Sequence, residues 1–232
     1  MSDTTNDSPR RPFIYEASSE SRWLTTTHLS DLFQEFFTQE DIGLSLLSER
    51  KLRLFACVCA RHFTPLLFDK RSEDAIEIAE WFCDSKAEVN DLLQAESSAR
   101  EVVGKYRGVA AHAAEAVANA LNSSSLSAAS AVSEEIREGT SRDEEIANRC
   151  DLLRDIFGNP FSPIESDPRW RTSNVVDLAQ VIYDERAFEK MPILSDALMD
   201  ASCDSEEIIA HCRGDGPHVR GCWVVDLLTG RE

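Results

Sequence analysis

The chain has 232 residues, and its composition and charge exclude several classes of protein. Hydrophobic residues make up 42% of it, which is typical of a globular protein and too high for a wholly disordered chain. It carries 24 Lys and Arg against 42 Asp and Glu, a net charge of −18 that repels the phosphate backbone of nucleic acids. No apolar run approaches the roughly 20 residues of a membrane-spanning helix, so we expect binding to neither nucleic acid nor membranes.

The cysteines and the N-terminal sequence predict a cytoplasmic location. The seven cysteines are an odd number and lie in apolar or helical contexts. The first residues have neither the basic region nor the apolar region of a secretory signal. A reducing compartment with free, mostly buried thiols is the simplest interpretation.

The chain begins with a segment that differs from the rest. Residues 1–22 are rich in Ser, Thr, Asp and Pro without lasting periodicity, which predicts a disordered N-terminal tail. Residues 23–232 then predict a single helical domain, in which an internal boundary near 122–142 is an option.

Apolar residues at helical spacing, preceded by capping residues, predict a series of helices in the first half of the domain. These cover Ser30 or Asp31 to Phe37, Glu40 to Leu47, Glu49 to Phe63 with Ser48 as N-cap, a helix capped by Ser72, a stretch over 86–121, and an alanine-rich helix to Glu138. Thr64-Pro65 should end the central helix, because the residue before Pro avoids the α conformation. Gly104 and Gly108 interrupt the long stretch and are expected to break or kink it.

The second half continues the helical pattern. The predicted helices are Asp143 to Phe157, one capped by Ser173 through Tyr183, one with Pro192 in its first turn, one over Ser205 to Cys212 capped by Asp204, and a last one with Trp223, Val224, Leu227 and Leu228 on one face. The segment 158–170 contains three prolines and is expected to be an extended connection. Because no strand-turn-strand pattern in the sequence is as clear as the helical periodicity, the sequence predicts an all-α, irregular multi-helix globular domain.

Four segments carry a resemblance to other proteins. They are Arg50 to Arg61, Cys150 to Phe161, Val176 to Tyr183 with the following Asp-Glu-Arg, and Ile209 to Leu228. Together they resemble an uncharacterised all-helical family found in many copies in planctomycete bacteria. The resemblance spans about residues 22–228 and implies a bacterial origin and a shared helical fold, but it implies no activity, cofactor or site.

The C-terminal region contains the densest group of potential metal ligands. Cys203, His211, Cys212, His218 and Cys222 lie within 20 residues, and all are residue types that bind zinc. Cys203, His211, His218 and Cys222 are the candidate zinc ligands, since the Gly-Asp-Gly-Pro loop can turn the chain between the histidines. The alternative is a set of buried thiols with a histidine that holds the loop, which the absence of a Cys-x-x-Cys pair favours.

A second cluster consists of Cys57, Cys59 and His62. A cysteine nucleophile with a histidine base is conceivable, because Cys59 and His62 share a helix face. The apolar neighbours of these residues favour a buried core helix instead. The sequence has no glycine-rich phosphate loop and no hydrolase or metalloprotease motif, so we assign no catalytic residue and no cofactor other than zinc.

These features favour a non-enzymatic, cytoplasmic helical module that binds another protein, and the acidity favours a basic partner. One alternative is an enzyme or regulator that uses zinc at the C-terminal Cys/His cluster. Another is an acidic, immunity-type protein that neutralises a basic toxin. In all three, we expect the segment from Cys222 onward to be an integral part of the fold, because its apolar face needs burial.

Overall fold

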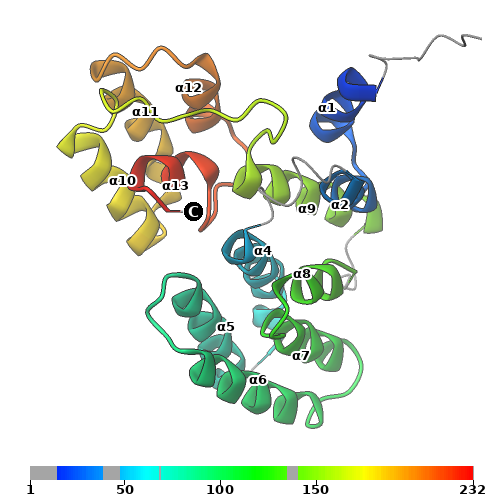
Figure 1. The fold of residues 1–232 in the computed structure, drawn as a ribbon. Helices are drawn as coiled ribbons and strands as arrows, with labels where there is room; N and C mark the ends of the chain where they lie inside the picture. Colours follow the sequence, from blue (N-terminus) through cyan, green and yellow to red (C-terminus); the bar gives the residue numbers. More distant parts are fainter. Residues whose placement is uncertain (1–14, 39–47, 68, 135–140, 232) are drawn as a thin grey trace, which may run out of the picture.

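The computed structural model describes residues 15–38, 48–67, 69–134 and 141–231, and every regular element in these ranges is a helix (Figure 1). The all-α fold is therefore confirmed. The α-helices are α1 (Tyr15–Thr25), α2 (Leu29–Thr38), α4 (Glu49–Arg61), α5 (Lys70–Cys83), α6 (Val89–Val103), α7 (Val109–Ala120), α8 (Ser125–Glu134), α9 (Arg142–Phe157), α10 (Ser173–Glu185), α11 (Met191–Asp200), α12 (Glu206–Arg213) and α13 (Trp223–Thr229). Two short 3-10 helices, η1 (Thr64–Leu66) and η2 (Phe188–Lys190), precede α5 and α11. Within the described ranges, no helix has both the length and the apolar character needed to cross a membrane.

The helix starts follow the capping rules, although three caps differ from the expected residue. Ser48 caps α4 as expected, since its hydroxyl accepts the Lys51 N–H at 3.4 Å. The corrected caps are Asp69 instead of Ser72, Thr172 instead of Ser173, and Ser205 instead of Asp204. In each pair both residue types are good N-caps, so residue type alone does not decide where the helix begins. The helix begins after the residue whose backbone is extended and whose side chain accepts a hydrogen bond from an unpaired N–H of the first turn.

The long helical stretch over 86–121 divides into α6 and α7. Gly108 has φ of +59°, a conformation that favours glycine, and α7 begins directly after it. At the N-terminus, α1 includes residues 15–22 of the predicted tail, and Trp23 is buried with its indole N–H donating to the Gly158 carbonyl at 3.0 Å. Residues 1–14, the predicted helix over 40–47 and residues 135–140 lie outside the described part of the chain.

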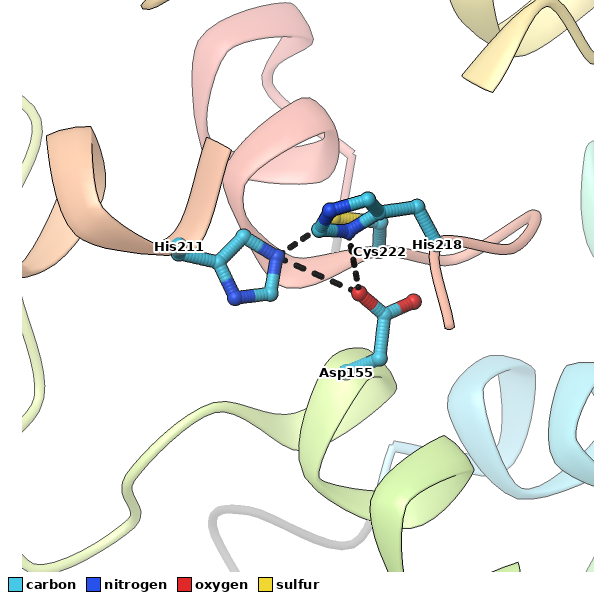
Figure 2. Close-up of side chains that lie close together, drawn as sticks. All are labelled: Asp155, His211, His218 and Cys222. Atoms are coloured by element: carbon cyan, nitrogen blue, oxygen red, sulfur yellow. Dashed lines mark hydrogen bonds and ion pairs between the residues drawn. The ribbon is translucent and has the colours of Figure 1, made fainter. Parts of the chain in front are cut away.

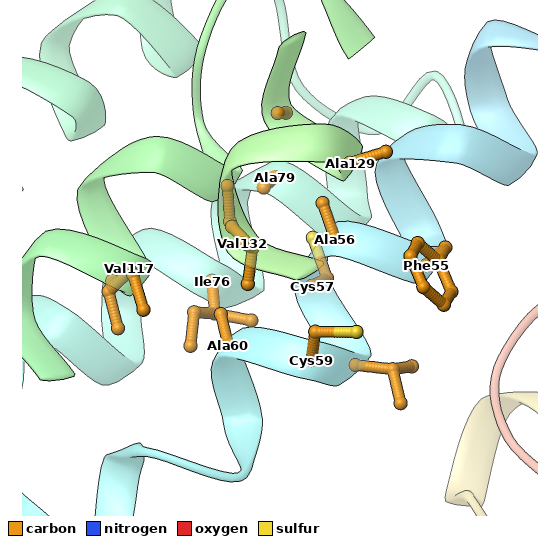
Figure 3. Packing of buried hydrophobic residues seen from close by; sticks show 14 of the residues in the cluster. Phe55, Ala56, Cys57, Cys59, Ala60, Ile76, Ala79, Val117, Ala129 and Val132 are labelled. Carbon is orange, nitrogen blue, oxygen red and sulfur yellow. The ribbon is translucent and has the colours of Figure 1, made fainter. Parts of the chain in front are cut away.

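Buried apolar side chains form two clusters. The first surrounds α4, whose residues from Leu54 to Cys57 are fully buried against α5, α7, α8 and α9 (Figure 3). Alanines on α7 and α8 allow these helices to approach α4 closely. The second cluster lies among α10 to α13. Along the chain the clusters divide between Phe161 and Ile164, except that Val219 packs against the first cluster. The segment near 122–134 contributes residues to the first cluster.

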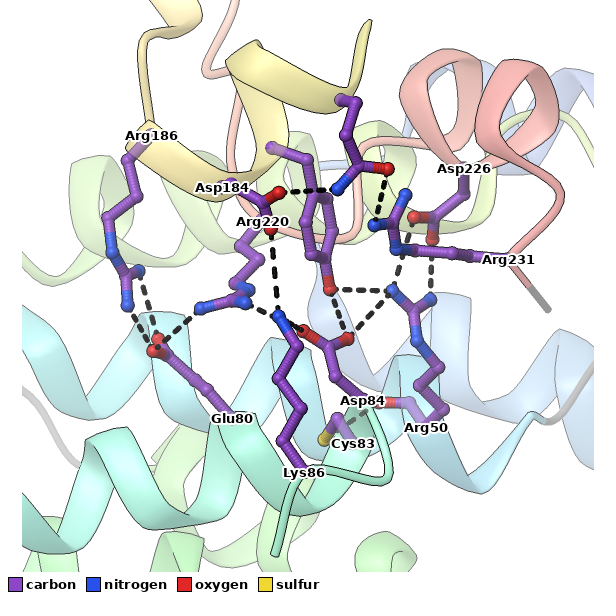
Figure 4. Close-up of polar contacts among 12 residues, drawn as sticks. Arg50, Glu80, Cys83, Asp84, Lys86, Asp184, Arg186, Arg220, Asp226 and Arg231 are labelled. Carbon is purple, nitrogen blue, oxygen red and sulfur yellow. Dashed lines mark hydrogen bonds and ion pairs between the residues drawn. The ribbon is translucent and has the colours of Figure 1, made fainter. Parts of the chain in front are cut away.

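Ion pairs join the two clusters (Figure 4). Glu80 of α5 is almost fully buried and binds the guanidinium groups of Arg61 and Arg186, and Arg220 lies 3.6 Å away. Burial opposes ionisation of Glu80, but these arginines lower the pKa of its carboxyl group. Arg50 of α4 donates two hydrogen bonds to Asp226 of α13, the shorter at 2.6 Å. Because a buried charge is costly without its partner, these pairs fix the orientation of α10 and α13 against α4 and α5.

Candidate metal centre

Four potential metal ligands from three parts of the chain lie together where the two clusters meet (Figure 2). Asp155 projects from the last turn of α9, and His211 projects from α12. His218 lies in the loop after α12, and Cys222 is the residue directly before α13. The site therefore depends on the packing of α12 and α13 against α9.

The ligand atoms of these side chains all lie within 4.8 Å of one another. Asp155 Oδ1 is 3.2 Å from His211 Nε2 and 3.1 Å from His218 Nδ1, and Cys222 Sγ is 3.1 Å from His211 Nε2. Zn–N and Zn–S bonds of about 2.0–2.3 Å place the ligands of a tetrahedral zinc about 3.3–3.7 Å apart. These three separations lie just below that range, and the whole group lies within 4.8 Å, so small shifts of the side chains would give a tetrahedral site.

The hydrogen bonds of His211 favour one tautomer of its ring. The indole N–H of Trp223 donates to His211 Nδ1 at 3.2 Å, so Nδ1 carries a lone pair in this arrangement. The proton of the neutral ring is then on Nε2, where it faces Asp155 and Cys222.

His218 has a different environment. Its Nδ1 faces Asp155 Oδ1, and its Nε2 faces the Gly214 carbonyl at 3.3 Å, so both neighbours are acceptors. Burial opposes protonation, but the hydrogen bond and the charge of Asp155 prevail and raise the pKa of His218. The second oxygen of Asp155 accepts the Val219 N–H at 3.0 Å. These bonds hold the loop, which agrees with the loop-holding role expected of His218 as an alternative to metal binding.

Cys222 is not placed to act as a nucleophile. Its side chain is fully buried, and burial together with the nearby Asp155 raises the pKa of the thiol well above its ordinary range. A catalytic Cys-His-Asp arrangement also needs the carboxylate on the ring nitrogen opposite the cysteine. Here Asp155 and Cys222 face the same nitrogen of His211. The group is therefore suited to ligation and not to covalent catalysis.

The structure brings together three of the four zinc candidates chosen from the sequence. His211, His218 and Cys222 belong to the group, whereas Cys203 follows α11 and packs against the second hydrophobic cluster. Asp155, which the spacing of the cysteines and histidines does not indicate, takes its place. One local signal exists, because Leu152, Asp155 and Ile156 share a buried face of α9, on which a carboxylate needs a partner.

A pocket of about 370 Å³ adjoins the group and is lined by Asp155, His211 and His218. Arg154 also lines this pocket, but its guanidinium group donates to the carbonyl oxygens of Trp23 and Thr26. Arg154 also pairs with the Asp151 carboxylate at 2.8 Å, so its positive charge is already engaged by protein oxygens. The pocket gives an ion a route from solvent to the ligands.

Comparisons with known proteins do not add to these observations, since no family model, no curated protein and no solved structure matches the chain. The resemblance to the planctomycete family stays a prediction.

Proposed function

We propose that the protein binds one Zn²⁺ ion through Asp155, His211, His218 and Cys222, and that the ion has a structural and not a catalytic role. The observation that supports this proposal is the convergence of four ligand atoms within 4.8 Å. Catalytic zinc sites keep a position open for water, whereas structural sites have four protein ligands. The ion would link α9 of the first cluster to α12 and α13 of the second.

The net charge of the four ligands and the free energy of zinc ligation both favour this proposal. One carboxylate, one thiolate and two neutral imidazoles balance the two charges of Zn²⁺. Ligation through His211 Nε2 moves the ring proton to Nδ1, so the Trp223 indole loses its acceptor and has to shift. Losing that bond costs about 1–3 kcal/mol. Structural zinc contributes about 10–16 kcal/mol in zinc-finger peptides, which is several times the cost of losing this bond.

Cobalt substitution tests the proposal. Dialysis of the full-length protein against Co²⁺ should give one ion per chain and a thiolate-to-cobalt absorption band. Cys222→Ser should abolish the band, and Cys203→Ser is the matched control that should retain it. Absence of stoichiometric uptake, or a band that persists in Cys222→Ser, would contradict the proposal.

A second proposal is that the protein binds another protein through the α5–α6 hairpin. In the part of the chain that the structure describes, three of the seven exposed large apolar side chains lie on these helices: Trp81, Val89 and Leu93. Such side chains are typical of contact surfaces when they lie close together. The net charge of −18 favours a basic partner.

A comparison of variants tests this second proposal. The wild type should retain a partner from native lysate that Trp81→Ser and Leu93→Ser lose. Ile193→Ser, at an exposed position on α11, is the control and should retain it. Equal retention by all variants would contradict a contact at α5–α6. If the partner is a basic toxin, its activity should fall on binding, which would favour the immunity-type alternative.

A further inference from the structure

A second pocket, separate from the candidate zinc ligands, lies between the start of α4, the connection after α9 and α13. Its volume is about 440 Å³, which is within the range of small-molecule sites. Phe157 and Trp223 give it aromatic walls, and Pro160, Pro163 and Leu227 add apolar surface. Gly158 has φ of +68°, and a Cβ added there would lie 3.1 Å from the Trp223 ring, so glycine allows this wall to form.

Lys51 places an ammonium group in this pocket. The group lies 5.8 Å from the centre of the Phe157 ring, and among the described residues it forms no ion pair. Burial lowers the pKa of Lys51, since it disfavours the charged form in the apolar surroundings. The carboxylate of Asp226 also lines the pocket, but Arg50 already binds both of its oxygens. Glu207, the other carboxylate of the lining, is exposed to solvent.

A second cation of the lining also has an unused donor. Arg231 Nη2 donates to Gln180 at 2.9 Å, and its guanidinium group stacks 4.0 Å from the centre of the Tyr183 ring. Its Nη1 is buried and has no hydrogen-bond partner among the described residues. Buried donors are normally paired, and because this nitrogen is closed to solvent it reaches an acceptor in the pocket only when the Arg231 side chain moves.

We propose that this pocket binds a small organic anion with a flat apolar body, whose carboxylate or phosphate group pairs with Lys51 and Arg231. The aromatic walls contact the body of the ligand, while the two cations supply the N–H donors that a carboxylate or a phosphate monoester accepts. None of the four proposed zinc ligands lines the pocket, but Trp223, which does, donates a hydrogen bond to His211, so the two sites share one wall.

Three simple probes test the site by ligand-observed NMR on the full-length protein. Benzoate carries the carboxylate, phenyl phosphate carries the phosphate ester, and benzamide is the neutral analogue of similar shape. At least one of the two anions should bind, at least about tenfold more tightly than benzamide. The anion that binds more tightly shows whether the natural ligand carries a carboxylate or a phosphate group. Failure of both anions to bind, or equal binding of benzamide, would overturn the proposal.

Variants locate the binding. Lys51→Met keeps the apolar stem and removes the charge, so it should weaken binding of the anion at least about tenfold. Lys105→Met removes an exposed lysine elsewhere and should leave binding unchanged. If Lys51→Met does not fold, Arg231→Gln is the second variant, and it should weaken binding in the same direction. Binding at wild-type strength in a folded Lys51 or Arg231 variant would overturn the proposal.

Discussion

The Cys57–His62 segment, at the end of α4, and the His211–Cys222 segment combine the same residue types but have different surroundings. Cys57 and Cys59 are fully buried among Ile76, Ala79 and other apolar side chains (Figure 3). Burial raises the pKa of Cys59 to about 12 and raises that of Cys57 well above its ordinary value, so both remain thiols. The expectation that α4 is a core helix, and not the location of a nucleophile, agrees with this burial.

In the C-terminal segment, a carboxylate from a distant part of the chain changes the chemistry. Asp155 contacts both His211 and His218, and Cys222 completes the group (Figure 2). The charges of Glu80 and Glu145 also act on Cys57 and Cys59, but among the described residues neither cysteine belongs to a group of potential metal ligands. The two segments therefore differ in whether a carboxylate and imidazoles lie close enough to the cysteine to share one ion.

The largest expected effect follows from deleting residues 222–232. This removes Val224, Val225 and Leu228, which are fully buried, together with Cys222 and the ion pair of Asp226 with Arg50. At about 25 cal/mol per Å² of apolar surface, the loss is several kcal/mol. For a chain of this size, each kcal/mol of lost stability lowers the melting temperature by about 2–4 °C. We therefore expect insoluble protein, or a melting temperature at least about 10 °C lower. An unchanged melting temperature would show that this segment is dispensable for stability.

Asp155→Asn should break the C-terminal group and leave the α4 core intact. The variant removes the charge that pairs with His218 and contacts His211, so Zn²⁺ affinity should fall at least about tenfold. Calorimetric titration with Zn²⁺ measures this change. Asp151→Asn, one turn earlier on α9 and exposed, is the matched control. If both variants bind Zn²⁺ equally, the carboxylate of Asp155 is not a ligand.

Cys59→Ser should destabilise the α4 core and leave zinc binding unchanged. It introduces a hydroxyl into an apolar environment, which costs about 1–3 kcal/mol of unfolding free energy where no partner is found. The number of Zn²⁺ ions bound per chain should not change. Denaturant unfolding and metal analysis of the same preparation measure both quantities. Loss of zinc in a folded Cys59→Ser protein would argue against the assigned ligands.

The smallest expected effect is a pH dependence that involves His218. Its pKa is raised in the folded protein, so the protonated ring favours folding. This contribution is complete below the unfolded-state pKa of about 6.5 and is lost as the pH rises through the folded-state pKa. Zinc binding has the opposite dependence, because it needs the neutral ring.

Thermal unfolding after metal removal measures this pH dependence. The protein without metal should become less stable as the pH rises from about 6 to about 8.5, while Zn²⁺ affinity increases over the same range. His218→Gln should flatten the stability profile. A profile of the same slope in wild type and variant would show that other groups determine it.

Much of the fold was predictable because helices depend on local pattern. The apolar spacing from Leu52 to Phe63 with the Ser48 cap predicted α4, and Gly158 after Phe157 predicted the end of α9. The glycines near 104 and 108 predicted a break that separates α6 from α7. Where two capping residues lie close together, as Asp69 and Ser72 do, local sequence did not decide between them.

The sequence by itself determined the residue types of the C-terminal cluster, because three of its ligands lie within a short stretch whose loop brings them together. Only the tertiary structure placed Asp155 beside them, 56 residues before His211, and placed Cys203 against the second hydrophobic cluster. The pairing of Arg50 with Asp226 and the pocket around Lys51 depend in the same way on how α13 packs against α4. Local hydrogen bonds and side-chain periodicity specify a helix, whereas contacts between distant helices depend on how their apolar faces pack together.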